Sequence, residues 1–223
     1  MPLSDEERTH IRHLIQEVGG ATNPSGWFEP LYQEAQGDFT QVPWAQMRVN
    51  PYLQDWLSQQ SAPQETAEAL VIGCGLGDDA EALSNLGYQV MAFDISPTAI
   101  AWCQQRFPDS QVTYQVADLF SPPDPWQDRF ALVYECRNFQ ALPVEVRGAG
   151  IQAIAACVAP QGHFLLITNY LGNELMPEGP PWPLSDSELA MIEAQGFIAL
   201  KREALDPPNS TLSPKLRVEY RRN

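Results

Sequence analysis

The segment ALVIGCGLGDDAEALSNLGYQVMAFD, residues 69–94, determines the architecture of this chain. Its first apolar run leads into three glycines two residues apart: Gly73, Gly75 and Gly77. A helix-forming segment follows over residues 78–86, and a second apolar run closes with Asp94. The order strand, glycine turn, helix, strand and acid is typical of the nucleotide-binding half of a doubly wound α/β fold.

The glycine spacing favours a ligand without phosphates. A dinucleotide fingerprint reads G-x-G-x-x-G, because its third glycine lets the helix pack beside a pyrophosphate. Here the pattern is G-x-G-x-G followed by Asp78 and Asp79, which we expect to satisfy the helix N-terminus and to repel a diphosphate. The turn therefore suits S-adenosylmethionine, with Asp94 accepting both ribose hydroxyls. The glycine turn of any α/β protein is the alternative on these residues alone.

A candidate adenine site follows the third predicted strand. Asp118 can accept from the adenine amino group, while Leu119 and Phe120 wall the ring and Ile95 completes the pocket. The alternative is that Asp118 only caps a turn before the proline-rich residues 121–125.

Strand and helix patterns alternate along the rest of the chain. The predicted strands are 69–73, 89–93, 111–116, 130–135, 163–169, 197–204 and 215–221. The predicted helices are 4–18, with Ser4 as cap and Glu7 three residues on, then 48–59, 78–86, 97–106, 144–158 and 185–195. Residues 19–37 are expected to be irregular. We predict an α/β fold, a Rossmann-like doubly wound sheet of seven strands, mostly parallel with an antiparallel C-terminal hairpin. Residues 1–60 are expected to form a lid and residues 61–223 the binding core of one compact domain.

Composition limits the class of protein. The 223 residues are 44% hydrophobic and carry a formal net charge of −15, which argues against a nucleic-acid partner. No apolar run reaches membrane-spanning length, and residues 1–14 are too charged for a signal peptide. Neither the three histidines nor the cysteines have metal-ligand spacing, and we interpret the cysteines as reduced thiols of a cytoplasmic protein. The cysteines are Cys74, Cys103, Cys136 and Cys157.

Four segments outside the glycine turn carry a family resemblance. They are 26–32 (GWFEPLY), 42–45 (VPWA) with 50–53 (NPYL), 134–142 (YECRNFQAL) and 179–184 (GPPWPL). With the motif order from Trp27 to Arg221, the chain resembles class I S-adenosylmethionine-dependent methyltransferases, and within them the thiopurine, thiol and halide methyltransferase group. The group often has Asp where this chain has Ala45, which leaves the substrate open. It often has an acid where this chain has Val71, so the methionine ammonium is expected at the Gly73 carbonyl and Glu135.

The resemblance implies S-adenosylmethionine as cofactor and a small molecule as methyl acceptor. The expected cofactor-binding residues are Trp44, Gly73, Gly75, Gly77, Asp94, Ile95, Asp118, Leu119 and Glu135. The expected substrate-binding residues are Trp27, Cys136, Arg137, Tyr170 and Trp182. Trp27 has the alternative role of packing the lid, and Arg137 that of pairing with a surface acid. The stiff loop at 179–184 is expected to wall the acceptor pocket, with Trp182 opposite Trp44.

No convincing general base is apparent, which favours a soft nucleophile such as a thiol or halide. A small-molecule O- or N-methyltransferase stays possible as an alternative. A nicotinamide-dependent oxidoreductase is disfavoured by the missing glycine at position 78. A non-catalytic domain that binds S-adenosylmethionine is the third alternative.

Overall fold

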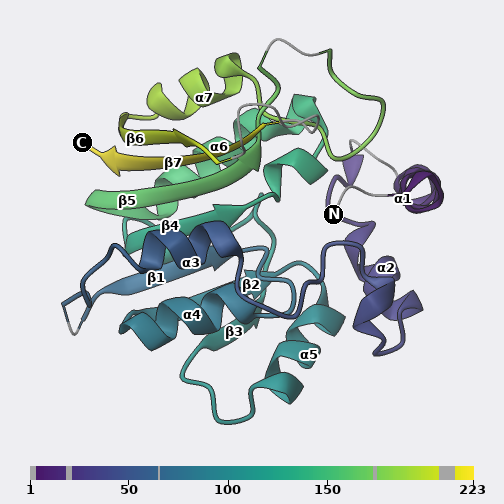
Figure 1. Ribbon diagram of the computed structural model, residues 1–223, viewed down its shortest axis with the longest axis horizontal. Coiled ribbons are helices and arrows are strands. Elements are labelled where there is room, and N and C mark those ends of the chain that lie inside the picture. Colours follow the sequence, from purple (N-terminus) through teal and green to yellow (C-terminus); the bar gives the residue numbers. More distant parts are fainter. Residues whose placement is uncertain (1–3, 19–21, 65, 173–174, 206–213) are drawn as a thin grey trace.

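A seven-stranded sheet forms the centre of the molecule in the computed structural model, which describes residues 4–18, 22–64, 66–172, 175–205 and 214–223 (Figure 1). The strands are β1 (Glu68–Ile72), β2 (Gln89–Asp94), β3 (Thr113–Val116), β4 (Phe130–Cys136), β5 (Val158–Asn169), β6 (Phe197–Ala204) and β7 (Lys215–Arg222). Their order is β3-β2-β1-β4-β5-β7-β6. The first five are parallel, and β7 is antiparallel to both of its neighbours. The predicted α/β architecture is confirmed.

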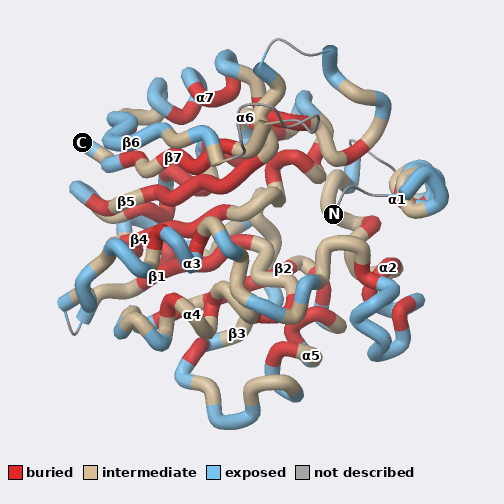
Figure 2. The backbone as a smooth tube through the Cα atoms, in the orientation of Figure 1, coloured by how far each residue is buried: buried red, intermediate tan, exposed pale blue. Residues whose placement is uncertain are grey.

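The central strands are buried on both faces, and alternate residues serve two separate cores. Leu70 of β1 packs in the core on the α6 side, with Ile151. Val71 packs in the opposite core, with Leu53 and Leu83. Because side chains alternate along a strand, a near-continuous apolar run supplies both cores at once. Figure 2 shows these strands as the most continuously buried part of the chain.

The helices that follow residue 50 cover both faces of the sheet, and the two before it pack in a separate cluster with Leu76 and Ala99. The helices are α1 (Asp5–Glu17), α2 (Phe28–Glu34), α3 (Pro51–Leu57), α4 (Asp78–Leu86), α5 (Pro97–Arg106), α6 (Val144–Cys157) and α7 (Asp186–Glu193). Three 3-10 turns, Phe39–Gln41, Asp124–Trp126 and Phe139–Ala141, complete the described elements. The predicted capping box of Ser4 and Glu7 is present at the start of α1.

One helix was missed, and several predicted boundaries were wrong by two to five residues, among them the starts of α3 and β5. Residues 28–34 form α2 instead of irregular chain, because Leu31 and Tyr32 are buried against the core. Residues 19–21 of the same prediction lie outside the described part. Helix α3 starts at Pro51 and not at residue 48, since the Asn50 side chain caps it by accepting from the Tyr52 N–H at 2.9 Å. Strand β5 starts at Val158, before a register shift relative to β4.

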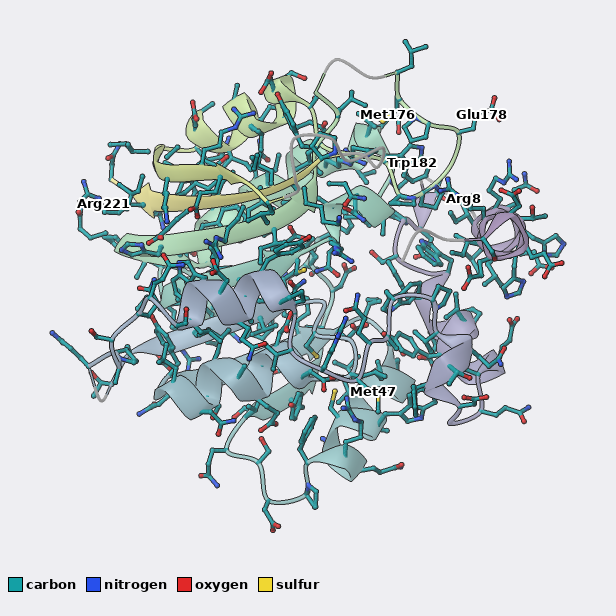
Figure 3. The ribbon with its side chains drawn as sticks, in the orientation of Figure 1. Arg8, Met47, Met176, Glu178, Trp182 and Arg221 are labelled. Carbon is teal, nitrogen blue, oxygen red and sulfur yellow. The ribbon has the colours of Figure 1, made fainter. Side chains whose placement is uncertain are left out.

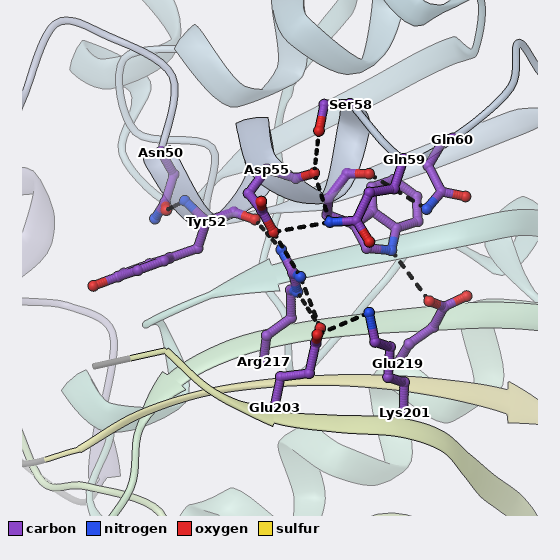
Figure 4. Close-up of polar contacts among 11 residues, drawn as sticks. Asn50, Tyr52, Asp55, Ser58, Gln59, Gln60, Lys201, Glu203, Arg217 and Glu219 are labelled. Atoms are coloured by element: carbon purple, nitrogen blue, oxygen red, sulfur yellow. Dashed lines mark hydrogen bonds and ion pairs between the residues drawn. The ribbon is translucent and has the colours of Figure 1, made fainter. Parts of the chain in front are cut away.

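Arg217 of β7 fastens α3 to the sheet (Figure 4). Its guanidinium donates to the Tyr52 carbonyl at 2.6 Å and pairs with Glu203 of β6 at 2.7 Å and Asp55 of α3 at 2.9 Å. The Arg217 side chain is only 3% exposed, whereas Asp55 and Glu203 are 59% and 31% exposed. The network holds the N-terminus of α3, and therefore Asn50, at the carboxyl edge of the parallel strands.

Candidate active site

A cavity of about 460 Å³ lies at the carboxyl edge of the parallel strands. Its walls come from the turns after β1, β2 and β4, from the N-terminal segment, and from the loop after β5. This loop lies against α1, since a side chain at Gly179 would meet Arg12 at 3.3 Å. Arg8 of α1 and the loop that carries Trp182 lie on the same side of the molecule (Figure 3). In open α/β sheets this edge is where ligands bind.

All three glycines of the turn after β1 line the cavity, but only Gly75 has room for a side chain. A side chain at Gly73 would meet Asn138 Oδ1 at 2.0 Å, and one at Gly77 would meet the Tyr114 hydroxyl at 2.6 Å. At Gly75, whose φ is +54°, the nearest such contact is the Tyr32 hydroxyl at 3.4 Å. Gly73 and Gly77 therefore permit packing within the protein, and Gly75 permits close approach from the cavity side.

Asp94 ends β2 and shapes the same turn. Its Oδ2 accepts from the Gly75 N–H and its Oδ1 from the Ser96 N–H, both at 3.0 Å. The carboxyl is buried, and burial raises its pKa to about 6 despite these two hydrogen bonds. Asp94 lies in the cavity wall, where the sequence placed the ribose contact.

Asp78 and Asp79 do not act as the expected caps of α4. Asp78 forms a two-pronged ion pair with Arg106 of α5, at 2.8 and 2.9 Å. Asp79 accepts from the Asn50 N–H at 2.7 Å and from the Tyr134 hydroxyl at 2.8 Å, and burial raises its pKa. The prediction failed because donors from distant segments reach these carboxylates. The pair instead ties α4 to α5, α3 and β4.

Aromatic side chains from the N-terminal segment wall the cavity. Trp44 donates its indole N–H to the Tyr32 hydroxyl at 2.9 Å and meets Trp27, Phe28 and Tyr32 edge-on. Trp27 stacks on Phe28 with ring centroids 4.0 Å apart and is 3% exposed. All four rings line the cavity, so Trp27 both packs the lid and faces the site. Phe28 and Tyr32 were missed as site residues, although they lie in the quoted GWFEPLY segment.

The turn after β4 supplies a polar wall. Asn50 donates its side-chain N–H to Cys136 Sγ at 3.1 Å, and Asn138 donates to the Ile72 carbonyl at 2.8 Å. Cys136, Arg137 and Asn138 all line the cavity. Asn50 and Asn138 were missed as site residues, although they lie in the quoted segments NPYL and YECRNFQAL, because each contacts a partner more than 60 residues away.

Of the remaining predicted site residues, some line a second cavity and others line neither cavity. Ile95 and Leu119 line a smaller adjoining cavity of about 40 Å³, together with Asp94 and Gly73. Neither cavity has Asp118, Glu135, Tyr170 or Trp182 among its lining residues. The flanking residues Pro180, Pro181 and Pro183 do line the larger one.

Three of these side chains have partners within the protein, and Trp182 is held through its backbone. Asp118 accepts from the Phe120 N–H at 2.9 Å, which is the turn cap considered as its alternative role. The Tyr170 hydroxyl donates to Asp186 at 2.8 Å, and the Trp182 backbone N–H donates to the Gln140 carbonyl at 2.7 Å. Glu135 is fully buried and accepts from the Phe139 N–H at 3.1 Å. Their ligand roles stay predictions.

Gly75 and Gly77 should respond differently to replacement by alanine. Gly75→Ala adds a methyl group on the cavity side and should lower the affinity for S-adenosylhomocysteine. Its cost in folding free energy should be limited to the strain of a positive φ, about 1–2 kcal/mol. Gly77→Ala drives its methyl into Tyr114 and should lower the melting temperature further. Titration calorimetry and thermal unfolding of both variants measure this; equal effects on binding would contradict it.

Within the described residues, no helix is long and apolar enough to cross a membrane. The same part of the chain holds no group of three or more His, Cys, Asp or Glu side chains placed to bind a metal ion.

The fold is that of class I S-adenosylmethionine-dependent methyltransferases. The N-methyltransferase NodS from Bradyrhizobium japonicum WM9, solved with S-adenosylhomocysteine, superposes with a TM-score of 0.65 at 17% identity, over 87% of this chain and 97% of that one. The family model for thiopurine S-methyltransferase matches residues 34–217, and the chain belongs to this family. S-adenosylmethionine is therefore its cofactor, and it is a methyltransferase of small molecules.

Two curated relatives are similar to this chain over most of its length. Thiocyanate methyltransferase 1 of Arabidopsis thaliana is 25% identical over 214 residues, 91% of this chain and 83% of the relative. A thiopurine S-methyltransferase of Pseudomonas putida is 28% identical over 194 residues, 80% of this chain and 87% of the relative.

Proposed function

We propose that this methyltransferase acts on the sulfur of a small thiol that binds beside the aromatic lid. The observation that carries the proposal is the state of the cavity carboxylates. Asp78 is paired with Arg106, Asp79 accepts from Tyr134, and Asp94 holds the glycine turn. A hydroxyl or protonated amine would need a base to remove its proton, whereas a thiol with a pKa of about 8.5 is already partly ionised at neutral pH. The sulfur substrates named for both relatives support this choice.

The residues around the two cavities fit the cofactor. Bound S-adenosylmethionine supplies an activated methyl group. We assign the ribose to Asp94, the adenine to the small cavity beside Ile95 and Leu119, and the methionine part to the turn at Gly75. The buried Trp27 indole N–H has no partner among the described residues, as expected for a donor that faces a ligand. Glu135 and Asp118 stay predicted cofactor contacts.

The aromatic rings give the acceptor an apolar wall and exclude water from the reacting atoms. Ring faces also attract a sulfonium. We propose that residues 1–60 act as a lid over the core of residues 61–223. Ile11, Leu31 and Tyr32 pack in one cluster with Leu76 and Ala99 of that core, which supports a lid held in contact with the site.

A turnover screen tests the proposed reaction. Thiols, iodide and matched hydroxyl and amine compounds are incubated with S-adenosylmethionine, and S-adenosylhomocysteine is measured. Turnover of thiols over their hydroxyl analogues is expected. Faster turnover of the hydroxyl analogue would overturn the choice of sulfur. Binding of S-adenosylhomocysteine without turnover of any acceptor would indicate a non-catalytic domain.

Asp94→Asn should weaken S-adenosylhomocysteine binding by about thirtyfold, or about 2 kcal/mol. The reason is that a charged acceptor of hydrogen bonds is lost while the side-chain shape is kept. The exposed Asp109→Asn serves as control, because Asp109 lies outside both cavities. Titration calorimetry measures both; equal affinity in the Asp94 variant and the parent would show that the ribose lies elsewhere.

We also propose a cytoplasmic location. The four cysteines are free, and two of them are buried, which suits a reducing compartment. Cell fractionation with an antibody to the chain tests this, and recovery from an extracytoplasmic fraction would contradict it.

A further inference from the structure

Several positive side chains line the main cavity. The protein has 13 lysines and arginines against 28 acids, yet four of these cations line this one cavity: Arg8, Arg48, Arg137 and Lys215. The acids that line it are Asp78, Asp79 and Asp94, and Asp78 is neutralised by Arg106 outside the lining. Positive side chains in a cleft attract anionic ligands. With Asp78 paired to Arg106, the cavity lining has more cations than uncompensated acids, in contrast to the protein as a whole.

Strand order places Arg137 in the acceptor half of the cavity. Along the sheet the order is β2, β1, β4, β5 and β7. Asp94 ends β2 and the glycine turn follows β1, so the proposed cofactor sites occupy that side. Arg137 follows β4, and Lys215 begins β7 beside Asn169 at the end of β5. Both cations therefore lie beyond the glycine turn as seen from Asp94.

The Arg137 backbone is held in an unfavourable conformation. Its φ is +67°, in the left-handed region that favours glycine, while its N–H donates to the Ile167 carbonyl at 3.0 Å. Such outliers collect at functional sites, where the surrounding structure maintains them. This conformation lets the arginine side chain leave the sheet and line the cavity.

The Arg137 guanidinium has unused donor capacity. Its Nε is buried without a hydrogen-bond partner, and no acid lies within ion-pair distance among the described residues. The surface pairing considered from the sequence is therefore not found. The nearby Asp79 is already engaged by Asn50 and Tyr134. A fork of N–H donors facing a cavity matches a planar carboxylate.

We propose that Arg137 binds the carboxylate of an anionic organic acceptor, so that the preferred substrates are thiols that also carry a carboxylate. The inference rests on the proposed sulfur methylation and adds the second charge on the acceptor. Arg48 stands two residues from Asn50, which contacts Cys136 next to Arg137, and it adds positive charge to the same wall.

The test compares 3-mercaptopropionate with its neutral methyl ester, in the parent protein and in Arg137→Gln. The parent should use the acid at least tenfold better in kcat/KM, mainly through KM, and the variant should use both about equally. Affinity for S-adenosylhomocysteine should stay within twofold. A parent that prefers the ester, or does not discriminate, would overturn the inference. Loss of S-adenosylhomocysteine affinity in the variant would overturn it too, because Arg137 would then serve the methionine carboxylate.

A second variant separates binding from folding. Arg137→Gly removes the side chain and relieves the positive φ, so it should unfold at the same or a higher temperature than the parent and still lose the preference for the acid. Calorimetric titration of 3-mercaptopropionate into the complex of the protein with S-adenosylhomocysteine measures acceptor binding without methyl transfer. If 3-mercaptopropionate binds in a way that depends on Arg137 but no thiol is methylated, only the proposed function is contradicted. If 3-mercaptopropionate does not bind, the proposed carboxylate site is contradicted.

Discussion

Replacing Glu135 by glutamine should make the folded protein about 3 kcal/mol more stable than the parent at pH 8, with little difference near pH 4. Burial in the sheet raises the pKa of this carboxyl from 4.5 to about 7, although the Phe139 and Asn138 N–H groups stabilise its charge. Its second oxygen, Oε2, has no partner among the described residues. Glutamine keeps the shape and the accepting oxygen but cannot ionise.

The direction follows from proton linkage. Between about pH 4.5 and 7 the folded parent keeps a proton on Glu135 that the unfolded chain has released. The contribution of this group is thus fully present below the unfolded pKa and is lost as the pH rises through about 7. The variant should lack this decline. Denaturant unfolding from pH 4 to 8 measures it, with the exposed Glu145→Gln as control. Parallel pH profiles for the parent and Glu135→Gln would contradict the prediction.

The same variant examines the predicted cofactor role of Glu135. If its carboxylate holds the methionine ammonium, Glu135→Gln should weaken S-adenosylhomocysteine binding. Unchanged affinity would leave Glu135 as a buried acceptor for the turn after β4. The two readouts are independent, because one is taken on the free protein and the other on the complex.

The sequence predicted best what neighbouring residues determine. The glycine turn, helices α4 and α5 and the acid at the end of β2 follow from periodicity and turn chemistry within 40 residues, and all were placed correctly. The antiparallel C-terminal pair was also predicted, since a short loop allows no parallel crossover. The family and the cofactor followed from motif order.

Contacts between distant segments could not be predicted in the same way. Asp78 and Asp79 suggested capping by the nearest N–H groups, yet Arg106 and Tyr134 reach them across the fold. Helix α2 has no side-chain cap, and its stability comes from the faces that Leu31 and Tyr32 bury. Asn138 fills the space that Gly73 leaves, a fit that only the folded chain reveals.

For the loop at 179–184, the sequence predicted the position of the prolines but not that of the Trp182 side chain. The prolines do line the cavity, as expected of a stiff wall, whereas the Trp182 side chain is not among the lining residues. Its backbone explains why the loop is held in place. The Trp182 N–H donates to Gln140, and its carbonyl accepts from Arg147 at 2.8 Å. Arg147 thereby becomes the residue on which the loop depends.

Arg147→Ala should cost about 3–5 kcal/mol of folding free energy, because it leaves a buried carboxylate without its partner. Arg147 is 1% exposed and pairs with Glu188 of α7 at 2.5 Å. It also donates to the Leu142 carbonyl at 3.1 Å, so one side chain joins α6, α7, the turn after β4 and the loop at Trp182.

The matched control is Arg202→Ala. Arg202 pairs with Asp186 in the same helix α7 at 2.9 Å, but its side chain is 45% exposed, so its loss should cost less than 1 kcal/mol. Denaturant unfolding compares the two variants. The double variant Arg147→Met with Glu188→Gln should recover part of the loss, because it removes the uncompensated charge. If Arg147→Ala proved no worse than Arg202→Ala, the buried pair would not be what holds the loop against the cavity, and the rigidity of that wall would have to come from its three prolines alone.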